Sequence, residues 1–367
     1  MGAYGKIKKL GIGLMHWMEY GFGGWAARRA MNNKLHSFYL AAAPEMDPAY
    51  KKAVEDFWRP YTLRFDFGWH RMYASTGSRD PRFLPDDIYL THIDRYMNDR
   101  DLSRGLRDKN YAALLFPEIN LPKTVIRIVD GTWMDGQYQL FTKEEALDAA
   151  MAEQELICKP TLDSGGGKNI RFWRVEDGRQ SLLAILNEMG ENVVVQEVIA
   201  QHETLNRLHK DSVNTIRLIT FLWKGEVHAL SAILRMGING NRMDNGGAGG
   251  IAAGILPDGR LKSRAFTENG IVYEQHPQGA RFEDCVVPNF QDLQETFKRA
   301  HVRLSHSKLI SWDIAVGTDG KPILVESNLY CGGIKLLQLN NGPLFGELTQ
   351  EVLETVFGKD QGTRKES

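Results

Sequence analysis

The chain is poor in cysteine, carries no excess of either charge and has no long apolar run. Its 367 residues include only Cys158, Cys285 and Cys331, which are far apart and form no CxxC pair. Odd, scattered cysteines argue against a disulfide framework or a structural zinc site and favour a reducing, cytoplasmic environment. The 45 Lys and Arg residues balance 46 Asp and Glu residues, which gives no sign of nucleic-acid binding. No apolar run approaches the roughly 18 residues that a membrane span needs.

The N-terminal sequence also lacks the features of a targeting segment. Basic residues occur near its start, but Trp17, Glu19 and Trp25 interrupt any apolar stretch. Lys6 stands where a myristoylation motif requires Ser or Thr.

Cys331, near the C-terminus, has no neighbouring base that would activate its thiol, so we expect it to be buried in the interior.

Three regions of the chain differ in their patterns. Residues 1–105 are rich in aromatic residues and helical in pattern, and we predict a helical region that binds a substrate or a partner. Residues 106–195 mix short helices with strands around a glycine-rich loop, whereas strands dominate residues 196–357. Residues 358–367 are expected to form a flexible tail. This order of short strands and helices favours an α+β fold over a doubly wound parallel sheet.

Capping residues mark two of the predicted helices. Asp47 followed by Pro48 is typical of a helix start, with Asp as the N-cap and Pro in the first turn. Thr142 and Glu145 have the spacing of a capping box, which predicts a helix from there through about Gln154.

A glycine-rich loop, Ser164, Gly165, Gly166 and Gly167, lies between two predicted strands. A Walker A loop or a Rossmann fingerprint would lie between a strand and a helix, so this placement argues against both. Successive glycines can still expose backbone N–H groups to a phosphate chain, although most such loops are simple turns. Lys159, in the strand before this loop, needs an anionic partner to offset its loss of hydration.

The strand VVVQEVI ends in Gln196 and Glu197. Adenine presents a donor and an acceptor on one edge, and a strand end can bind them with backbone groups and a side-chain acceptor. A strand that simply returns to solvent would show the same pattern, so this feature alone does not decide between the two interpretations.

The C-terminal hairpin, in the sequence SWDIAVGTDGKPILVESN, carries three oxygen-bearing side chains. A two-residue turn at Asp319-Gly320 would place Asp313 directly opposite Glu326, with Asn328 on the same face. Opposed carboxylates repel one another unless a cation lies between them, and this donor set suits Mg²⁺.

The same register predicts the opposite face of this hairpin. It would carry Trp312, Ile314, Ile323 and Val325, which would cover a core. A fully solvated hairpin would not need such a face, so the pattern favours a site on one side and a core on the other.

Taken in order, these motifs resemble the ATP-grasp superfamily. They are Lys109 before a helix, PKT, CKP, SGGG, QEVI, WDI and VESN. The runs VIAQHETLNRLHKDSVNTIRLIT and GGIAAGI are similar to its sugar-transfer-associated branch. The resemblance spans residues 106–345, and it implies two α+β subdomains that grip ATP. Residues 1–105 depart from it, because they do not have the pattern of the α/β domain that usually precedes this fold.

The resemblance also implies roles for individual residues. Lys109 and Lys159 would bind the ATP phosphates under the loop Ser164 to Gly167. Gln196, Glu197, Val198 and Ile199 would surround adenine, and His202 competes with Gln201 and Glu203 for the ribose. Asp313, Glu326 and Asn328 would coordinate Mg²⁺.

The implied reaction needs positive charge around a transferring phosphoryl group, and Arg217 and Arg235 are the candidates. A two-residue turn at Lys224-Gly225 would set Asn214 opposite Arg235 and put the two arginines on opposite faces. A three-residue bulged turn would bring both to one face, and we predict the bulged turn. Downstream, Asn245 and the glycines after it would let the backbone approach an acceptor, although a mobile loop would look the same.

We therefore expect an ADP-forming, ATP- and Mg²⁺-dependent ligase. A small-molecule carboxylate would attack the γ-phosphoryl group, and an amine would capture the acylphosphate, in natural-product, peptide or cell-surface sugar biosynthesis. A phosphotransferase acting on a hydroxyl or a sugar through the same site is the first alternative. A non-catalytic nucleotide-binding partner of a sugar-transfer assembly is the second, and the oligomeric state stays open.

Overall fold

The computed structural model describes residues 23–40, 43, 45–61, 66–162 and 169–358. The predicted phosphate loop, Ser164 to Gly167, and residues 359–367 of the predicted tail lie outside this set. The chain forms two compact units, one from residues 1–97 with 333–367 and the other from residues 98–332. No helix in the described ranges is long and apolar enough to cross a membrane.

The first unit is helical. Asp47 accepts hydrogen bonds from the backbone N–H groups of Ala49 and Tyr50, which confirms the predicted N-cap. The elements from the N-terminal side are α2 (Gly23–Lys34), η2 (Leu35–Tyr39), α3 (Pro48–Trp58), α4 (Gly68–Ala74), α5 (Asp86–Ile88), η3 (Tyr89–Ile93) and α6 (Asp94–Met97). The C-terminal side adds α13 (Lys335–Asn341), η10 (Gly346–Leu348) and α14 (Thr349–Gly358).

The two units divide at residues 97/98 and 332/333, whereas the sequence predicted regions that divide at 105, 195 and 357. The C-terminal helices join the N-terminal ones because their side chains bind there. Gln338 exchanges two hydrogen bonds with the backbone of Leu84, at 3.0 and 2.9 Å. The ring of Phe357 lies 6.1 Å from that of Tyr61. Gly358 ends α14 instead of beginning a tail.

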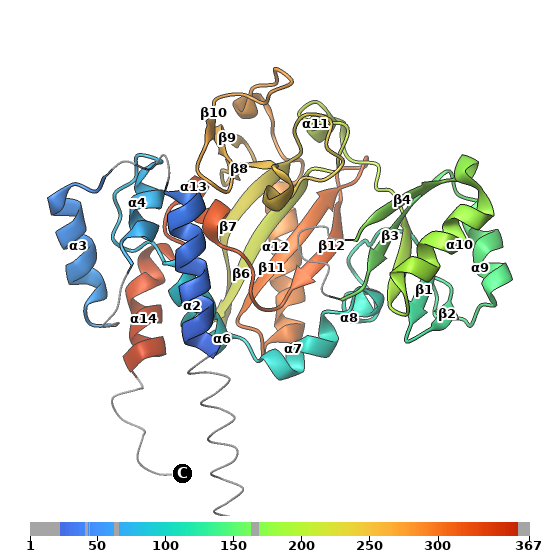
Figure 1. Ribbon diagram of the computed structural model, residues 1–367, viewed down its shortest axis with the longest axis horizontal. Coiled ribbons are helices and arrows are strands. Elements are labelled where there is room, and N and C mark those ends of the chain that lie inside the picture. Colours follow the sequence, from blue (N-terminus) through green and yellow to red (C-terminus); the bar gives the residue numbers. More distant parts are fainter. Residues whose placement is uncertain (1–22, 41–42, 44, 62–65, 163–168, 359–367) are drawn as a thin grey trace, which may run out of the picture. The chain divides into compact units, whose positions relative to one another are not determined.

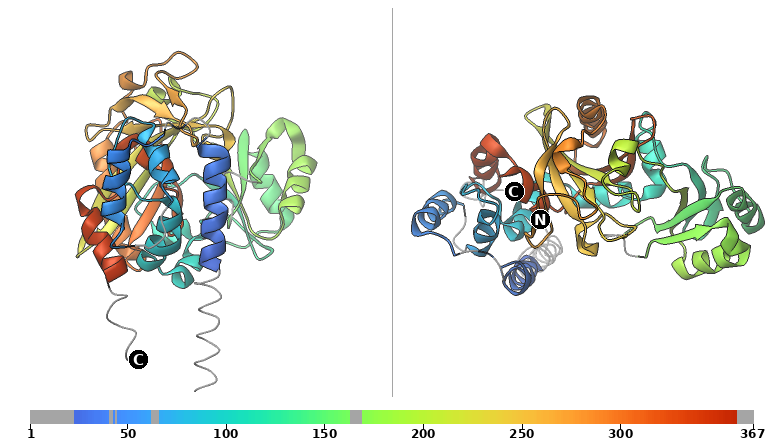
Figure 2. Two further views of the ribbon diagram at one scale, coloured as in Figure 1. Left: turned by 60° about the vertical axis from the view of Figure 1, so that its left-hand side comes forward. Right: turned by 90° about the horizontal axis from the view of Figure 1, so that it is seen from above.

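The second unit begins with short helical elements and an antiparallel five-stranded sheet of order β2-β1-β5-β3-β4. The helical elements are α7 (Arg100–Leu106), η4 (Lys109–Tyr111) and α8 (Ala112–Leu115). The strands are β1 (Thr124–Val129), β2 (Thr132–Met134), β3 (Glu155–Pro160), β4 (Arg171–Arg174) and β5 (Val193–Glu197). Helices α9 (Lys143–Met151) and α10 (Gly178–Met189) cover one face of this sheet (Figures 1 and 2).

Alternation along these strands separates a core face from an open face. Ile126, Val195 and Cys158 belong to the core beneath α9 and α10. Arg127 pairs with Val194, and Val194 pairs with Lys159, so all three project from the opposite face. The predicted capping box of α9 is present, although this helix ends at Met151 and not near Gln154.

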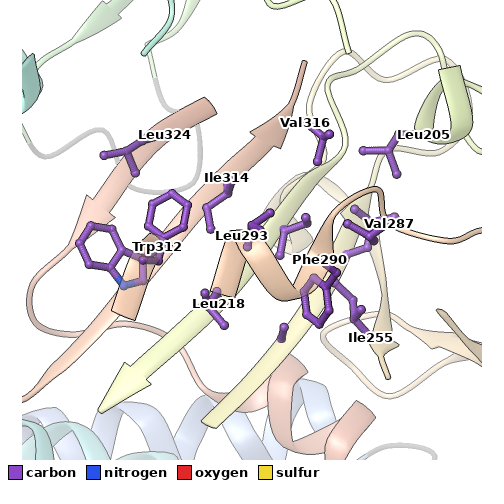
Figure 3. Close-up of a cluster of buried hydrophobic side chains, with 14 of the residues drawn as sticks. Leu205, Leu218, Ile255, Val287, Phe290, Leu293, Trp312, Ile314, Val316 and Leu324 are labelled. Atoms are coloured by element: carbon purple, nitrogen blue, oxygen red, sulfur yellow. The ribbon is translucent and has the colours of Figure 1, made fainter. Parts of the chain in front are cut away.

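The second sheet of this unit has seven antiparallel strands in the order β10-β9-β8-β7-β6-β11-β12. The strands are β6 (Thr215–Trp223), β7 (Glu226–Met236), β8 (Ile251–Ile255), β9 (Leu261–Phe266), β10 (Val272–Tyr273), β11 (Leu309–Val316) and β12 (Pro322–Asn328). Helix α12 (Phe290–His301) contributes Phe290 and Leu293 to a core with Leu218 of β6 and Trp312 of β11 (Figure 3). The short helix α11 (Glu203–Asn206) precedes β6.

The C-terminal hairpin has the predicted pairing of Asp313 with Glu326, but its turn is longer than predicted and one strand contains a bulge. Gly317 pairs with Lys321 across a longer turn than expected, with Gly320 at φ +76°. An irregularity between Asp313 and Ile314 then restores the predicted register. Because of this bulge, Leu324 is buried opposite Ile314 and enters the core. The expectation that Ile323 and Val325 would fill the core was therefore wrong.

The β6–β7 hairpin contains a similar compensation. Its turn is the two-residue Lys224-Gly225 type, with φ angles of 48° and 89°, so the predicted three-residue turn was wrong. A bulge farther along, between Ile219 and Thr220, shifts the register by one residue. Thr215, not Asn214, therefore lies opposite Arg235. The predicted consequence still holds, since both arginines bind one carboxylate, as described below.

Candidate functional site

Lys109 lies at the start of a short helical turn that is fixed at its backbone. The Asp108 side chain accepts a hydrogen bond from the Asn110 N–H at 2.9 Å and caps this turn. The Lys109 N–H donates to the carbonyl of Thr161, just beyond β3, at 3.3 Å. The Lys109 Nζ then lies 2.9 Å from Glu326 Oε1 on β12. This ion pair connects the turn that carries Lys109, which is bound to the five-stranded sheet near β3, to the C-terminal hairpin.

Lys159 is buried on the open face of the small sheet. Its Nζ donates to Gln196 Oε1 at 3.1 Å, and the Gln196 amide donates to Thr124 Oγ1 at 3.2 Å. Burial lowers the pKa of Lys159 to about 8, and the nearby charge of Lys109 adds to this effect while Glu326 opposes it. A buried ammonium with only a neutral partner favours an anion that supplies the missing charge.

Asp313 holds the two predicted arginines together. Arg217 binds it in a bidentate manner, with Nε and Nη2 at 2.9 and 2.8 Å from its two oxygens. Arg235 Nη2 lies 3.2 Å from Asp313 Oδ2. Burial would raise the pKa of Asp313, but the two guanidinium groups together hold it below its usual value. The arginines are thus oriented by a carboxylate that stays ionised.

Two residues of this network were missed at the sequence level. Thr215 Oγ1 accepts a hydrogen bond from Arg235 Nε at 3.0 Å. Asp244 accepts from the Thr215 backbone N–H at 2.9 Å and from its hydroxyl group. Asp244 lies in the loop after β7, so no spacing or strand pattern links it to Thr215. The signal that could have found it is the acidic residue directly before Asn245 in a glycine-rich loop.

Asn214 does not join the arginine pair. It is fully buried, and its amide donates to the carbonyls of Leu205 and His209 at 2.9 and 2.8 Å. The Gln201 side chain, also buried, accepts from the Asn214 N–H and donates to the carbonyls of His209 and Ser212. Asn214 and Gln201 thus hold the segment between β5 and β6, which leaves Gln201 little scope to bind ribose.

The residues around the end of β5 remain near the surface. Glu197 forms an ion pair with Lys123 at 2.6 Å, and its N–H donates to the Lys123 carbonyl. Val198 and Ile199 follow β5 and are half-buried. His202 caps α11 through Nδ1, and Glu203 pairs with Arg207 at 2.7 Å, so both have local partners.

The predicted metal ligands differ in how well they fit a cation. No cluster of three or more acidic, His or Cys side chains in the described part of the chain could hold a metal. Asp313 uses both oxygens on arginine. Glu326 is partly exposed and faces Lys109, while the Asn328 amide nitrogen is buried without a hydrogen-bond partner among the described residues. The Glu326 carboxylate and the Asn328 side-chain oxygen lie two residues apart on one strand and are the oxygen ligands that Mg²⁺ prefers, whereas Asp313 is engaged by arginine, so Glu326 and Asn328 fit the ion better than Asp313.

A family model described as sugar-transfer associated ATP-grasp matches residues 91–353. The chain belongs to this family. The two sheets of residues 98–332 therefore form an ATP-grasp fold, and the mixed helices and antiparallel sheets agree with the predicted α+β class. Most of the N-terminal helical region lies outside the matched residues.

Solved ATP-grasp structures resemble the chain at a distance. A D-cycloserine synthetase is 18% identical, with a TM-score of 0.41, and the match covers 70% of this chain and 73% of the other. A D-alanine–D-alanine ligase from Bacillus anthracis complexed with ATP is 16% identical, with a TM-score of 0.39 and coverages of 71% and 67%. A biotin carboxylase from Campylobacter jejuni is 13% identical, with a TM-score of 0.42 and coverages of 69% and 46%. No curated protein matches the sequence.

Cys331, beside the ATP-grasp hairpin, contradicts the expectation of burial. It is exposed, has a φ of 55° and accepts a hydrogen bond from Arg100 Nη2 at 3.2 Å. The chain turns sharply after Tyr330, which carries the cysteine out of the core that Leu329 enters.

Proposed function

We propose that the protein is an ADP-forming ligase that joins a small-molecule carboxylate to an amine through an acylphosphate, with ATP and Mg²⁺. The ion pair between Lys109 and Glu326 carries this proposal. The ion pair places Lys109, which we expect to bind the phosphates, beside β12, the strand that carries the candidate metal ligands Glu326 and Asn328. Membership of the ATP-grasp family supports nucleotide-dependent chemistry at this place.

The two lysines would bind the phosphate chain from the open face of the small sheet. Lys159 would exchange a neutral amide partner, Gln196, for phosphate oxygen, which restores its full charge. Lys109 would leave Glu326 and turn to the phosphates, which frees the carboxylate. Glu326 and Asn328 would hold Mg²⁺, and the bound ion supplies positive charge that offsets the charge of the phosphoryl oxygens.

The two arginines would stabilise the charge that develops during phosphoryl transfer. Arg217 uses Nε and Nη2 on Asp313, so Nη1 is the donor that Asp313 does not engage. Arg235 is anchored by Thr215 and Asp313. Because both guanidinium groups are already oriented, little reorganisation is needed when the acylphosphate forms. Substrates from natural-product, peptide or cell-surface sugar biosynthesis fit this proposal.

The metal assignment is tested by the double variant Glu326→Gln with Asn328→Ala. We expect Mg-ATP turnover to be lost while the thermal unfolding transition is retained, because both metal ligands are removed without a cavity in the core. Glu188→Gln with Asn187→Ala, both exposed on α10, is the matched control and should keep full turnover. Unchanged turnover in the site variant would refute the assignment of these ligands.

The reaction type is tested with a panel of carboxylates labelled with ¹⁸O in the carboxyl group. A ligase transfers one labelled oxygen to the released phosphate, and hydroxylamine in place of the amine gives a hydroxamate. ADP release with a stable phosphoester, independent of any amine, would instead identify a phosphotransferase and overturn the proposal.

A further inference from the structure

Arg127 is a buried cation that the roles assigned so far do not use. Its residue is 3% exposed, between Ile126 and Ile128 on β1. No described carboxylate forms an ion pair with it, and its Nε is buried without a hydrogen-bond partner among the described residues. Burial lowers the pKa of Arg127 below its usual value, which reflects the cost of holding this charge in the interior. A cation retained at such a cost needs an explanation beyond packing.

The remaining donors of Arg127 bind backbone carbonyls. Its Nη1 donates to the Asn110 carbonyl at 3.0 Å, and its Nη2 donates to the Gly136 carbonyl at 3.4 Å. Tyr138 stacks on the guanidinium group, with its ring centroid 4.4 Å from Cζ. The Tyr138 hydroxyl donates to the same Asn110 carbonyl at 2.5 Å. One carbonyl oxygen is therefore held by two side chains from β1 and the loop after β2.

The backbone at Tyr138 is strained to make this contact. Its φ is 63°, in the left-handed region that aromatic residues seldom adopt. Asp135 holds the loop in this shape, since its carboxylate accepts from the N–H groups of Gln137 and Gln139, both at 2.8 Å. Strain maintained by its surroundings is typical of functional loops.

Asn110 follows Lys109 directly, so the held carbonyl belongs to the turn that presents the phosphate lysine. Asn110 is fully buried, and its side chain donates to the Ile128 carbonyl on β1 at 3.3 Å. On the other side, the Lys109 N–H is bound to Thr161. Hydrogen bonds thus fix the backbone on both sides of Lys109, and Arg127 makes one of these bonds.

We propose that Arg127 and Tyr138 are positioning residues that set Lys109 for the phosphates of the nucleotide. They do so by holding the Asn110 carbonyl, with Arg127 on the same sheet face as Lys159. This inference rests on the proposed nucleotide site and names which residues preorganise it. It predicts an effect on phosphate binding and none on the adenosine part of the ligand.

Isothermal titration of the full chain with adenosine, ADP and ATP, all with Mg²⁺, tests the proposal. Arg127→Met should weaken ATP and ADP binding by about tenfold or more, because a preorganised charge-assisted contact is lost. Adenosine affinity should change by less than about twofold, because no contact with the base is removed. Arg174→Met, an exposed arginine on β4 of the same sheet, is the matched control and should leave all three affinities unchanged.

A second variant covers the case in which Arg127→Met fails to fold. Tyr138→Phe removes only the hydroxyl that binds the Asn110 carbonyl, and it should weaken ATP binding in the same phosphate-dependent way by a smaller factor. In a Lys109→Met background, Arg127→Met should add less than about twofold, because its effect passes through Lys109.

The outcomes separate this inference from the proposed function. Equal loss of adenosine, ADP and ATP would show a purely structural role and overturn the inference, as would a full additional loss in the Lys109→Met background. Unchanged ATP affinity in both Arg127→Met and Tyr138→Phe would overturn it too. Failure of the unaltered protein to bind ATP would overturn the proposed function itself, and the inference with it.

Discussion

At the scale of single residues, the candidate site contains buried charged side chains whose charges are only partly balanced by neighbours of opposite charge. Lys159 has a neutral amide as its partner, whereas Asp313 is shared by two guanidinium groups. In a low-dielectric interior such charges are costly when unpaired and strongly attract a complementary ligand. The excess of cations around one hairpin therefore favours a polyanionic ligand.

The lowered pKa of Lys159 predicts how ATP binding depends on pH. In the free protein this lysine loses its proton as the pH rises through about 8, whereas bound phosphate would favour the charged form and raise the pKa. We therefore expect ATP affinity to fall as the pH rises above about 8, and ATP binding near pH 8.5 to take up about three-quarters of a proton. Titration calorimetry in buffers with different ionisation enthalpies measures this uptake.

Lys159→Met serves as the control for that experiment, because it removes the group that titrates. The variant should bind ATP more weakly and without the proton uptake above pH 8. An equal uptake in the variant would assign the titration to another group and contradict the role of Lys159.

At the scale of elements, a bulge sets the register in each of two hairpins. In the C-terminal hairpin the bulge offsets a turn that is one residue longer than a two-residue turn, and in the β6–β7 hairpin it shifts by one residue the register that a two-residue turn begins. In each, the bulge decides which side chains face the core. A one-residue shift moves a strand's side chains to the other face, so Arg217 and Arg235 share Asp313 only because the β6–β7 bulge exists.

The turn that starts this hairpin can be tested at Gly225. Its φ is 89°, and the space that a Cβ would occupy is open, so Gly225→Ala meets no clash but must adopt a left-handed backbone. We expect it to lower the free energy of unfolding by about 1–2 kcal/mol. Urea unfolding monitored by circular dichroism gives the value.

A matched Gly→Ala change shows that the effect is due to φ. Gly105 in α7 also has open space, and it lies in helical backbone, so Gly105→Ala should raise stability by up to about 1 kcal/mol. If both substitutions stabilised the protein equally, the turn geometry assigned to Lys224-Gly225 would be wrong.

At the scale of the whole molecule, two hydrophobic cores lie within residues 98–332. One core includes Phe116 and Leu329 near the limits of this segment, and the other lies under α9 and α10. All the described residues of both clusters belong to this unit. We therefore expect the ATP-grasp part to bury its apolar residues without help from the helical unit.

This independence predicts that a fragment of residues 98–332 folds by itself. We expect a cooperative thermal transition and ATP affinity within about threefold of the full chain, because every candidate nucleotide residue lies inside the fragment. Calorimetric unfolding and titration with Mg-ATP measure both properties. An aggregated or non-cooperative fragment would show that the helical unit is needed for folding.

Much of the candidate site could be predicted from sequence because it depends on local patterns. Lys159 and Gln196 stand out as polar residues in apolar strands, and the Asp313–Glu326 pair follows from strand alternation. Asp244 and Thr215 could not be predicted, since their contact depends on how a long loop folds back. Asn214 was placed wrongly opposite Arg235 in one alternative because a bulge inside a strand leaves no clear sequence signal.

The sequence alone determined the family, the order of the elements and the helix caps, because short-range periodicity and motif order are properties of the chain itself. Tertiary structure decided the partners of the charges. Arg217 and Arg235 meet at Asp313, Lys109 reaches Glu326, and Arg127 grips the turn that carries Lys109. These contacts join distant segments, so bulges, loop closure and the balance between burial and charge determine them, and none of these is written in a local pattern.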